Sequence, residues 1–413
     1  MGNKIMCRFC HHELKDTFID LGMSPLSNSY ISKKYLNKGQ MTYPLYARVC
    51  RNCFLVQLEE VQTPSDIFTD YAYFSSFSSS WLEHAEKYTE YMVDTYGLNE
   101  KSYVVEIASN DGYLLQYFKA KNIPVLGIEP AVNVAETARI EKGIQTISEF
   151  FSAELAGELV KGGKKADLLL GNNVLAHVPN INDFVEGMKI FLADNGIITM
   201  EFPHLLNLIE QSQFDTIYHE HFSYLSFMTV QKIFAAHDLR IFDVQEWSTH
   251  GGSLRIFACH KKCVIYQDTG YIEKILLKER KAGLEDINTY LDFSEKVKKI
   301  KYRLLECLIT FKNKNKSIVA YGAAAKGNTL LNYCGIRTDI IDYVVDKNPH
   351  KQDTLLPGSR IPVYDPKKIR ETKPDYILIL PWNLQEEIME QLVYVREWGA
   401  KFILPIPNVE VIE

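Results

Sequence analysis

The sequence predicts an α/β protein with a small N-terminal cysteine-bearing module and two α/β domains built on parallel strands. A buried strand, a small-residue turn, a helix and a second strand ending in an acid occur twice, after residue 103 and again after residue 316. Two Cys-x-x-Cys pairs before residue 54 mark the module. We therefore expect three parts: a metal-binding module over 1–70, a domain over 71–260, and a helical connector with the last domain over 261–413.

Composition narrows the class of protein. The 413 residues are 46% hydrophobic and 24% charged, with a formal net charge of -6, which predicts two or three globular domains. Acidic and basic residues are mixed and form no basic stripe, so we expect no nucleic-acid partner. No apolar run is long enough for a membrane span, and the N-terminus lacks a signal-peptide core. We expect a cytoplasmic monomer or small homo-oligomer with no membrane partner.

Four of the eight cysteines predict a structural zinc site. They are Cys7 and Cys10 in one Cys-x-x-Cys pair, and Cys50 and Cys53 in the other. Zinc accepts four thiolates tetrahedrally, and a site closed in this way has no open position for catalysis. Two unrelated thiol turns, a redox pair and a nucleic-acid-binding ribbon are alternatives. One shared site is the simplest account of two similar pairs.

The first α/β unit predicts a nucleoside site. Residues 104–107 form a buried strand, 108–112 a tight turn, and 125–130 a second strand that ends with Glu129. The turn contains one glycine, Gly112, and not the G-x-G-x-x-G cradle for phosphates. A nucleoside without phosphates is therefore expected, and S-adenosylmethionine is the common one. The Glu129 carboxylate can accept bonds from both ribose hydroxyls.

Further along, residues 166–179 predict a buried strand that runs into a polar loop, and 196–203 predict another strand. The residues that we expect to hold the methyl donor are Ala108, Asn110, Glu129, Asn172, Asn173 and His177. Phe150 is either an adenine-stacking ring or a core aromatic. The serine- and aromatic-rich segment 70–84 is either an active-site lid or a linker that caps the helix expected from Trp81 to about Tyr96.

The run Tyr218-His219-Glu220-His221 gathers the densest chemistry in the chain. It has three interpretations: a metal site, an acid/base site, or a structural polar patch. Alternate residues of a strand face opposite sides, so the run must bend if Tyr218, Glu220 and His221 converge. The later segment His250-Gly251-Gly252-Ser253 opens a strand and is either a plain hairpin turn or part of a site wall.

The last domain repeats the pattern, with strands expected over 317–321, 340–346 and 375–383. A small-residue turn over 322–330 enters a helix, and Lys326 adds a positive charge to its N-terminus. Helix N-termini bind anions, so a phosphate-bearing ligand is expected. The alternative is a domain that only packs. Residues 270–315 predict a connecting pair of helices.

Three segments, 106–112, 127–130 and 172–178, resemble class I methyltransferase motifs. With the four cysteines and the Tyr218–His221 run, nearly the whole chain resembles the zinc-containing sugar C-methyltransferases, which act on nucleotide-linked keto-deoxysugars. The resemblance implies a Rossmann-like central domain, a Rossmann-like C-terminal domain, zinc and S-adenosylmethionine. The site residues that it implies are Tyr218, Glu220 and His221, with Tyr71 or Tyr73 as a further tyrosine, then His250, Gly251 and Ser253 near the substrate, and Lys326 and Asn328 at its nucleotide diphosphate.

The expected reaction is methyl transfer from S-adenosylmethionine to a carbon next to the keto group, through an enolate. We expect His221 to act as base or relay, Tyr218 as its partner or as a donor to the enolate, and Glu220 to orient them. A nucleotide-sugar O-methyltransferase is the alternative. A nicotinamide-dependent sugar oxidoreductase and a non-enzymatic zinc-ribbon adaptor are hypotheses from other classes.

Overall fold

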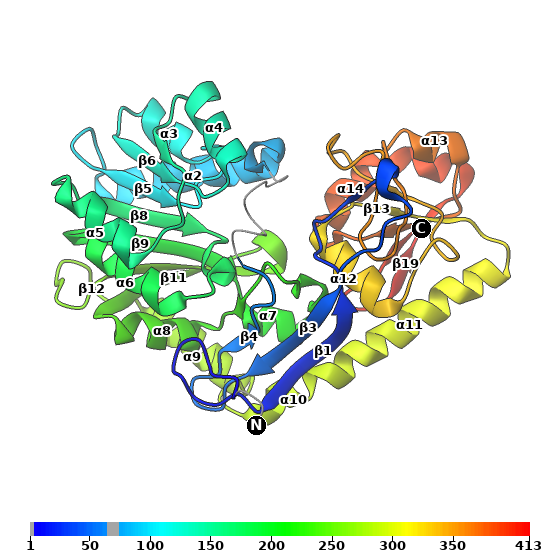
Figure 1. Cartoon of the computed structure of the whole chain (residues 1–413), viewed down its shortest axis with the longest axis horizontal. Helices are drawn as coiled ribbons and strands as arrows, with labels where there is room; N and C mark the ends of the chain where they lie inside the picture. Colours follow the sequence, from blue (N-terminus) through cyan, green and yellow to red (C-terminus); the bar gives the residue numbers. More distant parts are fainter. Residues whose placement is uncertain (1–3, 64–73) are drawn as a thin grey trace. The chain divides into compact units, whose positions relative to one another are not determined.

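The computed structural model describes residues 4–63 and 74–413 (Figure 1). The chain forms two compact units. The first unit contains the chain up to Leu14, Cys50–Leu205 and Phe222–Glu285. The second contains Lys15–Val49, Leu206–His221 and Asp286–Glu413. The residues expected in the N-terminal module are thus divided between the units, with all four cysteines in the first.

A seven-stranded sheet with the order β11-β12-β9-β8-β5-β6-β7 is the centre of the first unit (Figure 1). Its strands are β5 (Val104–Ile107), β6 (Val125–Ile128), β7 (Thr146–Ile147), β8 (Ala166–Asn172), β9 (Leu192–Pro203), β11 (Leu239–Trp247) and β12 (Ser253–His260). Strands β5 to β9 run parallel, β12 pairs antiparallel with β9, and β11 pairs antiparallel with β12. All four residues of β5 are buried, which is typical of a parallel strand covered on both faces. The strand predicted at 104–107 is confirmed, and those predicted at 125–130 and 196–203 are present as β6, which ends at Ile128, and β9, which begins at Leu192. The strand predicted within 166–179 is β8, which ends at Asn172.

Helices cover this sheet. They are α2 (Ser79–Tyr96), α3 (Leu115–Ala120), α4 (Val132–Glu141), α5 (Ala153–Lys161), α6 (Ile181–Phe191), α8 (Phe227–Ala236) and α9 (Gly270–Lys281). Helix α7 (Leu205–Glu210) belongs to the second unit from Leu206 onward. The helix predicted from Trp81 is confirmed. The Ser78 hydroxyl accepts a bond from the Trp81 N–H, and Gly97 ends the helix with φ +68°. Ala85, Tyr88 and Met92 pack one face of α2 into the core.

The second unit contains a six-stranded sheet with the order β16-β14-β13-β17-β18-β19. Its strands are β13 (Ile318–Tyr321), β14 (Val344–Val345), β16 (Val363–Tyr364), β17 (Tyr376–Ile379), β18 (Lys401–Leu404) and β19 (Glu410–Ile412). Helix α12 (Ala325–Cys334) follows β13, as predicted, and α13 (Lys368–Thr372) and α14 (Gln385–Gln391) follow later. The strand expected over 340–346 was too long, because residues 338–340 form a turn and only Val344–Val345 pairs in the sheet.

Two N-terminal strands, β1 (Asp16–Ser24) and β3 (Tyr43–Val49), pair antiparallel in the second unit. The stretch 270–315 was predicted to form a pair of connecting helices, but it forms three. They are α9, α10 (Ile287–Leu291) and α11 (Phe293–Asn313). Gly283 at φ +81° ends the α9 segment, and the Asp286 side chain caps α10 by accepting from the Asn288 N–H, so the stretch breaks twice. Helix α11 packs Phe293 against Phe18 of β1, with ring centroids 4.5 Å apart.

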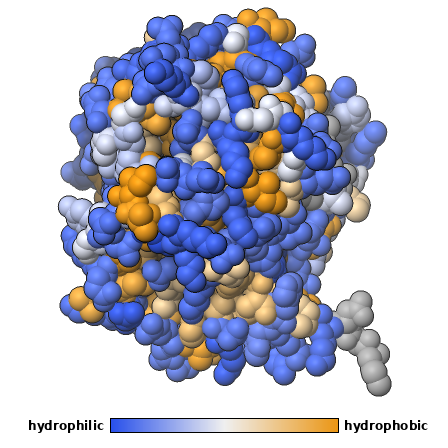
Figure 2. All heavy atoms as spheres, turned by 90° about the vertical axis from the view of Figure 1, so that its left-hand side faces the viewer, coloured by the Kyte–Doolittle hydropathy of each residue, from blue (hydrophilic) through white to orange (hydrophobic). Residues whose placement is uncertain are grey.

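None of the described helices is long and apolar enough to cross a membrane. The face drawn in Figure 2 is mostly hydrophilic, with small hydrophobic areas between the polar side chains.

Candidate active site and zinc centre

The four predicted cysteines converge in the first unit. Their sulfur atoms all lie within 4.8 Å of one another, with Cys7 Sγ 3.6 Å from Cys53 Sγ and Cys10 Sγ 3.5 Å from Cys50 Sγ. A tetrahedral zinc with Zn–S bonds of about 2.3 Å separates its sulfurs by about 3.8 Å. The residues present therefore fit zinc. Among the described residues, this is the only group of three or more such side chains placed to hold a metal.

The backbone explains why each pair points inward. A left-handed residue follows each Cys-x-x-Cys, His11 at φ +58° and Phe54 at φ +64°. Their N–H groups bond back to the carbonyls of Cys7 and Cys50, which closes both turns. The Gln57 amide also donates to Cys7 Sγ at 3.2 Å. Two identical tight turns and one amide donor thus set the four thiols toward one point.

The predicted nucleoside turn lies at the carboxyl ends of β5 and β6. Ala108 and Asn110 have left-handed backbones, with φ +55° and +48°. Glu129 is buried, and its two carboxylate oxygens accept from the N–H groups of Asn110 and Ala131, both at 2.9 Å. Burial raises the pKa of Glu129 to about 6 against the opposing effect of these bonds. Each oxygen has a further lone pair for a hydroxyl, so the geometry fits ribose recognition.

Close packing between strand and turn requires a glycine here. A Cβ at Gly127 would lie 2.4 Å from the Ser109 hydroxyl oxygen and 2.9 Å from that of Thr146. Any side chain at this position of β6 would displace the turn that carries Asn110. The donor turn is therefore fixed by strand packing as well as by its own backbone.

The end of β8 and the polar loop after it contain the next predicted residues. The Asn172 amide donates to the Tyr113 hydroxyl at 3.1 Å. Asn173, at φ +55°, places its amide nitrogen 2.7 Å from His250 Nε2. His177 follows in the short 3-10 helix η3 (Leu175–His177). The structure thus brings together Asn173, expected near the donor, and His250, expected near the substrate.

The two neighbouring phenylalanines, Phe150 and Phe151, differ in their exposure to solvent. Phe150 is 45% exposed, whereas Phe151 is buried with its ring centroid 5.5 Å from that of Phe184. The core aromatic of this segment is therefore Phe151. Phe150 is left with an open ring face, and its stacking on adenine stays a prediction.

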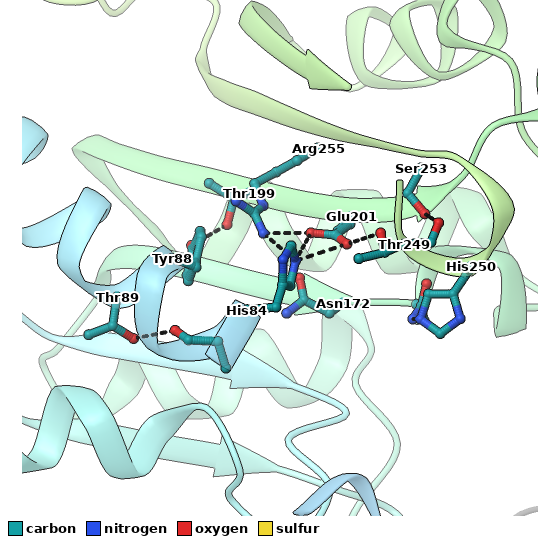
Figure 3. A network of polar contacts seen from close by, with 12 residues as sticks. His84, Tyr88, Thr89, Asn172, Thr199, Glu201, Thr249, His250, Ser253 and Arg255 are labelled. Atoms are coloured by element: carbon teal, nitrogen blue, oxygen red, sulfur yellow. Dashed lines mark hydrogen bonds and ion pairs between the residues drawn. The ribbon is translucent and has the colours of Figure 1, made fainter. Parts of the chain in front are cut away.

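A buried polar network that the sequence analysis missed lies beside His250 (Figure 3). Glu201 of β9 is fully buried, with Oε2 2.6 Å from Arg255 Nη2 of β12 and 2.9 Å from His84 Nε2 of α2. The Thr249 hydroxyl donates to Glu201 Oε1 at 2.8 Å. Burial raises the pKa of Glu201, but Arg255, His84 and Thr249 outweigh it and lower the pKa to about 2.

This network is connected to the loop that holds His250. Thr249 precedes His250 in η5 (Thr249–Gly251), and His250 has a left-handed backbone at φ +55°. The Trp81 ring lies 5.0 Å from His84 and 5.2 Å from His250, centroid to centroid. Ser253 is buried and donates to the Thr249 carbonyl at 2.9 Å. The signal that could have revealed the network is a charged residue in the middle of each of two apolar strand sequences, Glu201 and Arg255.

The central run bends and brings Tyr218 and His221 together, whereas Glu220 contacts Asn28. The His221 N–H bonds to the Tyr218 carbonyl at 2.9 Å, which closes a turn. The Tyr218 hydroxyl then lies 2.8 Å from His221 Nε2, and His221 Nδ1 lies 2.9 Å from the Thr216 carbonyl oxygen. A carbonyl only accepts, so the assigned tautomer of neutral His221 bears its proton on Nδ1 and has a free electron pair on Nε2. That electron pair accepts from the Tyr218 hydroxyl.

The other members of the run face different partners. Glu220 is buried and accepts from the Asn28 amide at 2.6 Å. His219 Nε2 lies 3.2 Å from the Pro44 carbonyl oxygen, and its ring meets that of Tyr43 edge to face. Burial lowers the pKa of His219. The described residues around the run offer no group of three metal-binding side chains, so the metal interpretation gains no support.

The C-terminal part of the second unit holds the run in place. The Trp382 indole donates to Asp215 Oδ2 at 2.7 Å, and the Thr329 hydroxyl donates to the Ile217 carbonyl at 3.0 Å. Asp215 is fully buried, and burial raises its pKa to about 6 against the opposing charge of Lys326 and the bond from Trp382. The two anchored residues, Asp215 and Ile217, flank Thr216, whose carbonyl fixes the His221 tautomer.

The two residues expected at a diphosphate have partners within the protein. The Lys326 ammonium lies over the Trp382 ring, 5.2 Å from its centroid, and donates to the Asn383 side-chain oxygen at 3.4 Å. Burial lowers the pKa of Lys326. Asn328 is buried, and its amide donates to the Ser27 carbonyl at 2.6 Å. The remaining predicted positions, Tyr71 and Tyr73, lie outside the described residues.

Comparison with known proteins completes this description. Three family models match: "Putative zinc binding domain" over residues 7–68, "Methyltransferase domain" over 81–244 and "C-methyltransferase C-terminal domain" over 248–407. The C-methyltransferase NovU of Streptomyces niveus is 34% identical over 406 residues, which cover 98% of this chain and 96% of that protein. The chain belongs to the zinc-binding C-methyltransferases.

S-adenosylmethionine is accordingly the methyl donor of this C-methyltransferase, and the cysteine cluster is its structural zinc site. The family also decides between carbon and oxygen as the methyl acceptor, which the sequence had left open, in favour of carbon. The oxidoreductase and adaptor hypotheses are wrong for the same reason.

Solved structures give a weaker likeness. Magnesium protoporphyrin IX methyltransferase (ChlM) from Synechocystis PCC 6803 with bound SAM matches 49% of this chain and 100% of its own, with 12% identity and a TM-score of 0.37. A SAM-dependent methyltransferase from Anabaena variabilis ATCC 29413 matches 49% and 99%, with 13% identity and a TM-score of 0.38. Likeness at this level carries no argument about substrate or mechanism.

Proposed function

We propose that this C-methyltransferase methylates the carbon next to the keto group of a nucleotide-linked keto-deoxysugar, after a base has converted that carbon into an enolate. The observation that supports the proton-transfer step is the Tyr218–His221 pair, with its 2.8 Å contact and a His221 tautomer fixed by the Thr216 carbonyl. The nucleotide-sugar substrate is supported by the resemblance of the whole chain to enzymes of that class.

A carbon next to a ketone becomes a nucleophile only after it loses a proton. In the proposed step the Tyr218 oxygen takes this proton while its own proton passes to His221 Nε2. The electron pair of the broken C–H bond moves into the C–C bond, and the carbonyl oxygen becomes the enolate oxygen. His221 becomes an imidazolium whose Nδ1–H still donates to the Thr216 carbonyl. Histidine suits this role because its ordinary pKa lies near neutral pH.

S-adenosylmethionine supplies an electrophilic methyl group to the enolate carbon. This chain holds the ribose of the donor through Glu129, whose oxygens are fixed by the N–H groups of Asn110 and Ala131. Asn172 at the end of β8 and the following Asn173 and His177 are the candidates for the methionine end.

The second α/β sheet supports a second nucleotide by repeating one detail of the first. The N–H of Ala323, in the turn after β13, bonds to Asp346 Oδ2 at 2.7 Å, just as the Asn110 N–H bonds to Glu129. In both sheets an acid after the neighbouring strand holds the turn. In dinucleotide-binding α/β folds an acid that follows the glycine-rich turn by about 20 residues accepts from a ribose hydroxyl.

The deciding experiment is proton exchange without the methyl donor. The enzyme is incubated in D₂O with a nucleotide-linked 4-keto-2,6-dideoxyhexose, and deuterium next to the keto group is followed by mass spectrometry. We expect exchange by the wild type and a loss of roughly 10²–10⁴-fold in His221→Ala. His350→Ala, an exposed histidine of the same unit, is the matched control. Undiminished exchange in both His221→Ala and Tyr218→Phe would place the base elsewhere.

A further inference from the structure

An open cavity of about 390 Å³ lies in the second unit, between strands β1 and β3 along the sequence. Its walls include three tyrosines, Tyr30, Tyr35 and Tyr43, together with the Lys38 side chain and the Gln40 amide. Its volume lies within the range of about 300–1,000 Å³ that is typical of small-ligand sites. Neither the family comparisons nor the sequence patterns assign a role to it.

Contacts with residues 354–360 of the second unit hold the walls of the cavity in place. Strand β2 (Ile31–Ser32) pairs with β15 (Thr354–Leu355). The Gln40 side chain accepts from the Gly358 N–H at 2.8 Å. The Arg360 guanidinium donates to the carbonyls of Leu36 and Lys38, both at 2.7 Å. A wall tied at so many points is preformed, which lowers the entropy lost on ligand binding.

The side chains of the walls suit a ligand that has both a planar ring and a negative charge. Aromatic rings offer stacking faces to a base, and a lysine offers a point charge to phosphate. Among the described residues that line the cavity, Lys38 is the one charged side chain, and its ammonium lies 4.5 Å from the Tyr35 ring centroid. A ring and a cation therefore stand next to each other on one wall.

The cavity also adjoins the run proposed to handle the proton. The Tyr43 ring lines the cavity and meets His219 edge to face, with centroids 6.0 Å apart. Asn28, next to the lining residue Ser29, donates to Glu220. The Tyr30 hydroxyl donates to the Ala323 carbonyl in the turn after β13. All of these residues belong to the second unit, so their adjacency is internal to it.

We propose that this cavity binds the nucleoside diphosphate of the sugar substrate, with the base against the tyrosine rings and the phosphates at Lys38. The inference rests on the proposed function, because it requires a nucleotide-linked substrate. It moves the nucleotide from Lys326 and Asn328, which are engaged with Trp382, Asn383 and Ser27, to the segment 26–43. The sugar then extends from the cavity toward Glu220 and His221.

The test is calorimetric titration of the full-length, zinc-loaded protein with thymidine, uridine, cytidine and guanosine diphosphates in turn. We expect at least one of them to bind to the wild type. Lys38→Gln should weaken that binding by about tenfold or more, because it removes the charge-assisted contact. Lys34→Gln is the matched control, since Lys34 is exposed and lies on the same Tyr35 ring at 4.8 Å but does not line the cavity.

The aromatic wall is tested in the same way. Tyr35→Ala should weaken binding by about tenfold, whereas Tyr35→Phe retains the stacking face and should bind close to the wild type. S-adenosylmethionine titrated into each variant checks that the first unit is intact, and circular dichroism checks the fold.

Three results would overturn the inference. Equal binding by wild type, Lys38→Gln and Tyr35→Ala would place the nucleotide elsewhere and leave the proposed function standing. Equal weakening by Lys34→Gln and Lys38→Gln would mean general surface charge and not this cavity. Binding of none of the four diphosphates by the wild type would remove the nucleotide-sugar substrate and the cavity assignment together.

Discussion

The Tyr218 hydroxyl and His221 Nε2 are 2.8 Å apart, and their direction of donation is set on the far side of the imidazole ring, where the Thr216 carbonyl holds Nδ1 at 2.9 Å. The carbonyl thereby orients a pair that lies three residues apart in a single turn. Because Thr216 is itself adjacent to two anchored residues, the pair depends on packing in the C-terminal part of the chain.

The anchors of the run should affect turnover more than binding. Thr329→Val removes the hydroxyl that holds the Ile217 carbonyl, and we expect a loss of roughly tenfold in kcat with little change in KM. Thr329→Ser retains the hydroxyl and should recover most of kcat. A rise in KM at constant kcat would show instead that Thr329 serves substrate binding.

Trp382→Phe should also lower kcat, because it changes the contact with Asp215. The variant leaves a fully buried carboxyl without its indole donor, so the Asp215 turn loosens and kcat falls. Trp398→Phe is the matched control, because its indole donates to the Pro374 carbonyl, far from the run in sequence. The measurement is steady-state kinetics of all three proteins, and equal kinetics in the two variants would contradict the anchoring role of Trp382.

Arg255 should be one of the most sensitive positions for stability. Arg255→Met leaves the buried Glu201 carboxylate without its cation, and we expect a loss of about 3–5 kcal/mol in the free energy of unfolding. Chemical denaturation measures it, and the double variant Glu201→Gln with Arg255→Met should recover part of the loss. No recovery would mean that the packing of Arg255 over the Tyr88 and Trp247 rings, at 4.5 and 4.7 Å, outweighs its charge.

The pH dependence of this ion pair has a defined sign. The folded pKa of Glu201, about 2, lies below the ordinary value of 4.5, so the pair stabilises the fold fully above pH 4.5. That contribution is lost as pH falls from 4.5 through 2. The free energy of unfolding of the wild type should therefore fall by this contribution as the pH is lowered through that range. The free energy of unfolding of the double variant should not show this fall. Identical acid profiles would contradict the shifted pKa.

Donor affinity should fall in mild acid. The raised pKa of Glu129, about 6, means that its carboxylate takes up a proton below that pH and loses acceptor capacity for ribose hydroxyls. Calorimetry of S-adenosylmethionine between about pH 7.5 and 5.5 should show weaker binding at the lower pH. Glu129→Gln should bind weakly with no such dependence. Zinc content is measured in each sample, because loss of metal from the thiols would give a similar trend.

Zinc removal should unfold part of the first unit. Cys50→Ser opens the four-sulfur site, and we expect loss of bound zinc in metal analysis together with a lower Tm. Cys307→Ser, a partly exposed thiol on α11, should change neither. Full zinc retention in Cys50→Ser would contradict a site closed by four cysteines.

The sequence predicts some of these features and not others for physical reasons. Strands β5 and β8 were visible because parallel strands that are buried on both faces are rich in apolar residues, as in Val104-Val105 and Leu168-Leu169-Leu170. Cys-x-x-Cys spacing is equally local. The contacts of Glu201 join residues 54 and 117 positions apart, and no local pattern records such a distance. The cavity near Tyr35 was missed for the same reason, since its walls are held by residues 354–360.

The order in which the chain enters its two units affects how it is made. Six segments alternate between the units, and the second unit contains Lys15–Val49, Leu206–His221 and everything from Asp286 onward. Domains generally fold as units during synthesis. Here the first two pieces of the second unit leave the ribosome long before the residues that complete their core. We therefore expect C-terminal truncations to abolish the Tyr218–His221 pair, although every atom of that pair remains in the shortened chain.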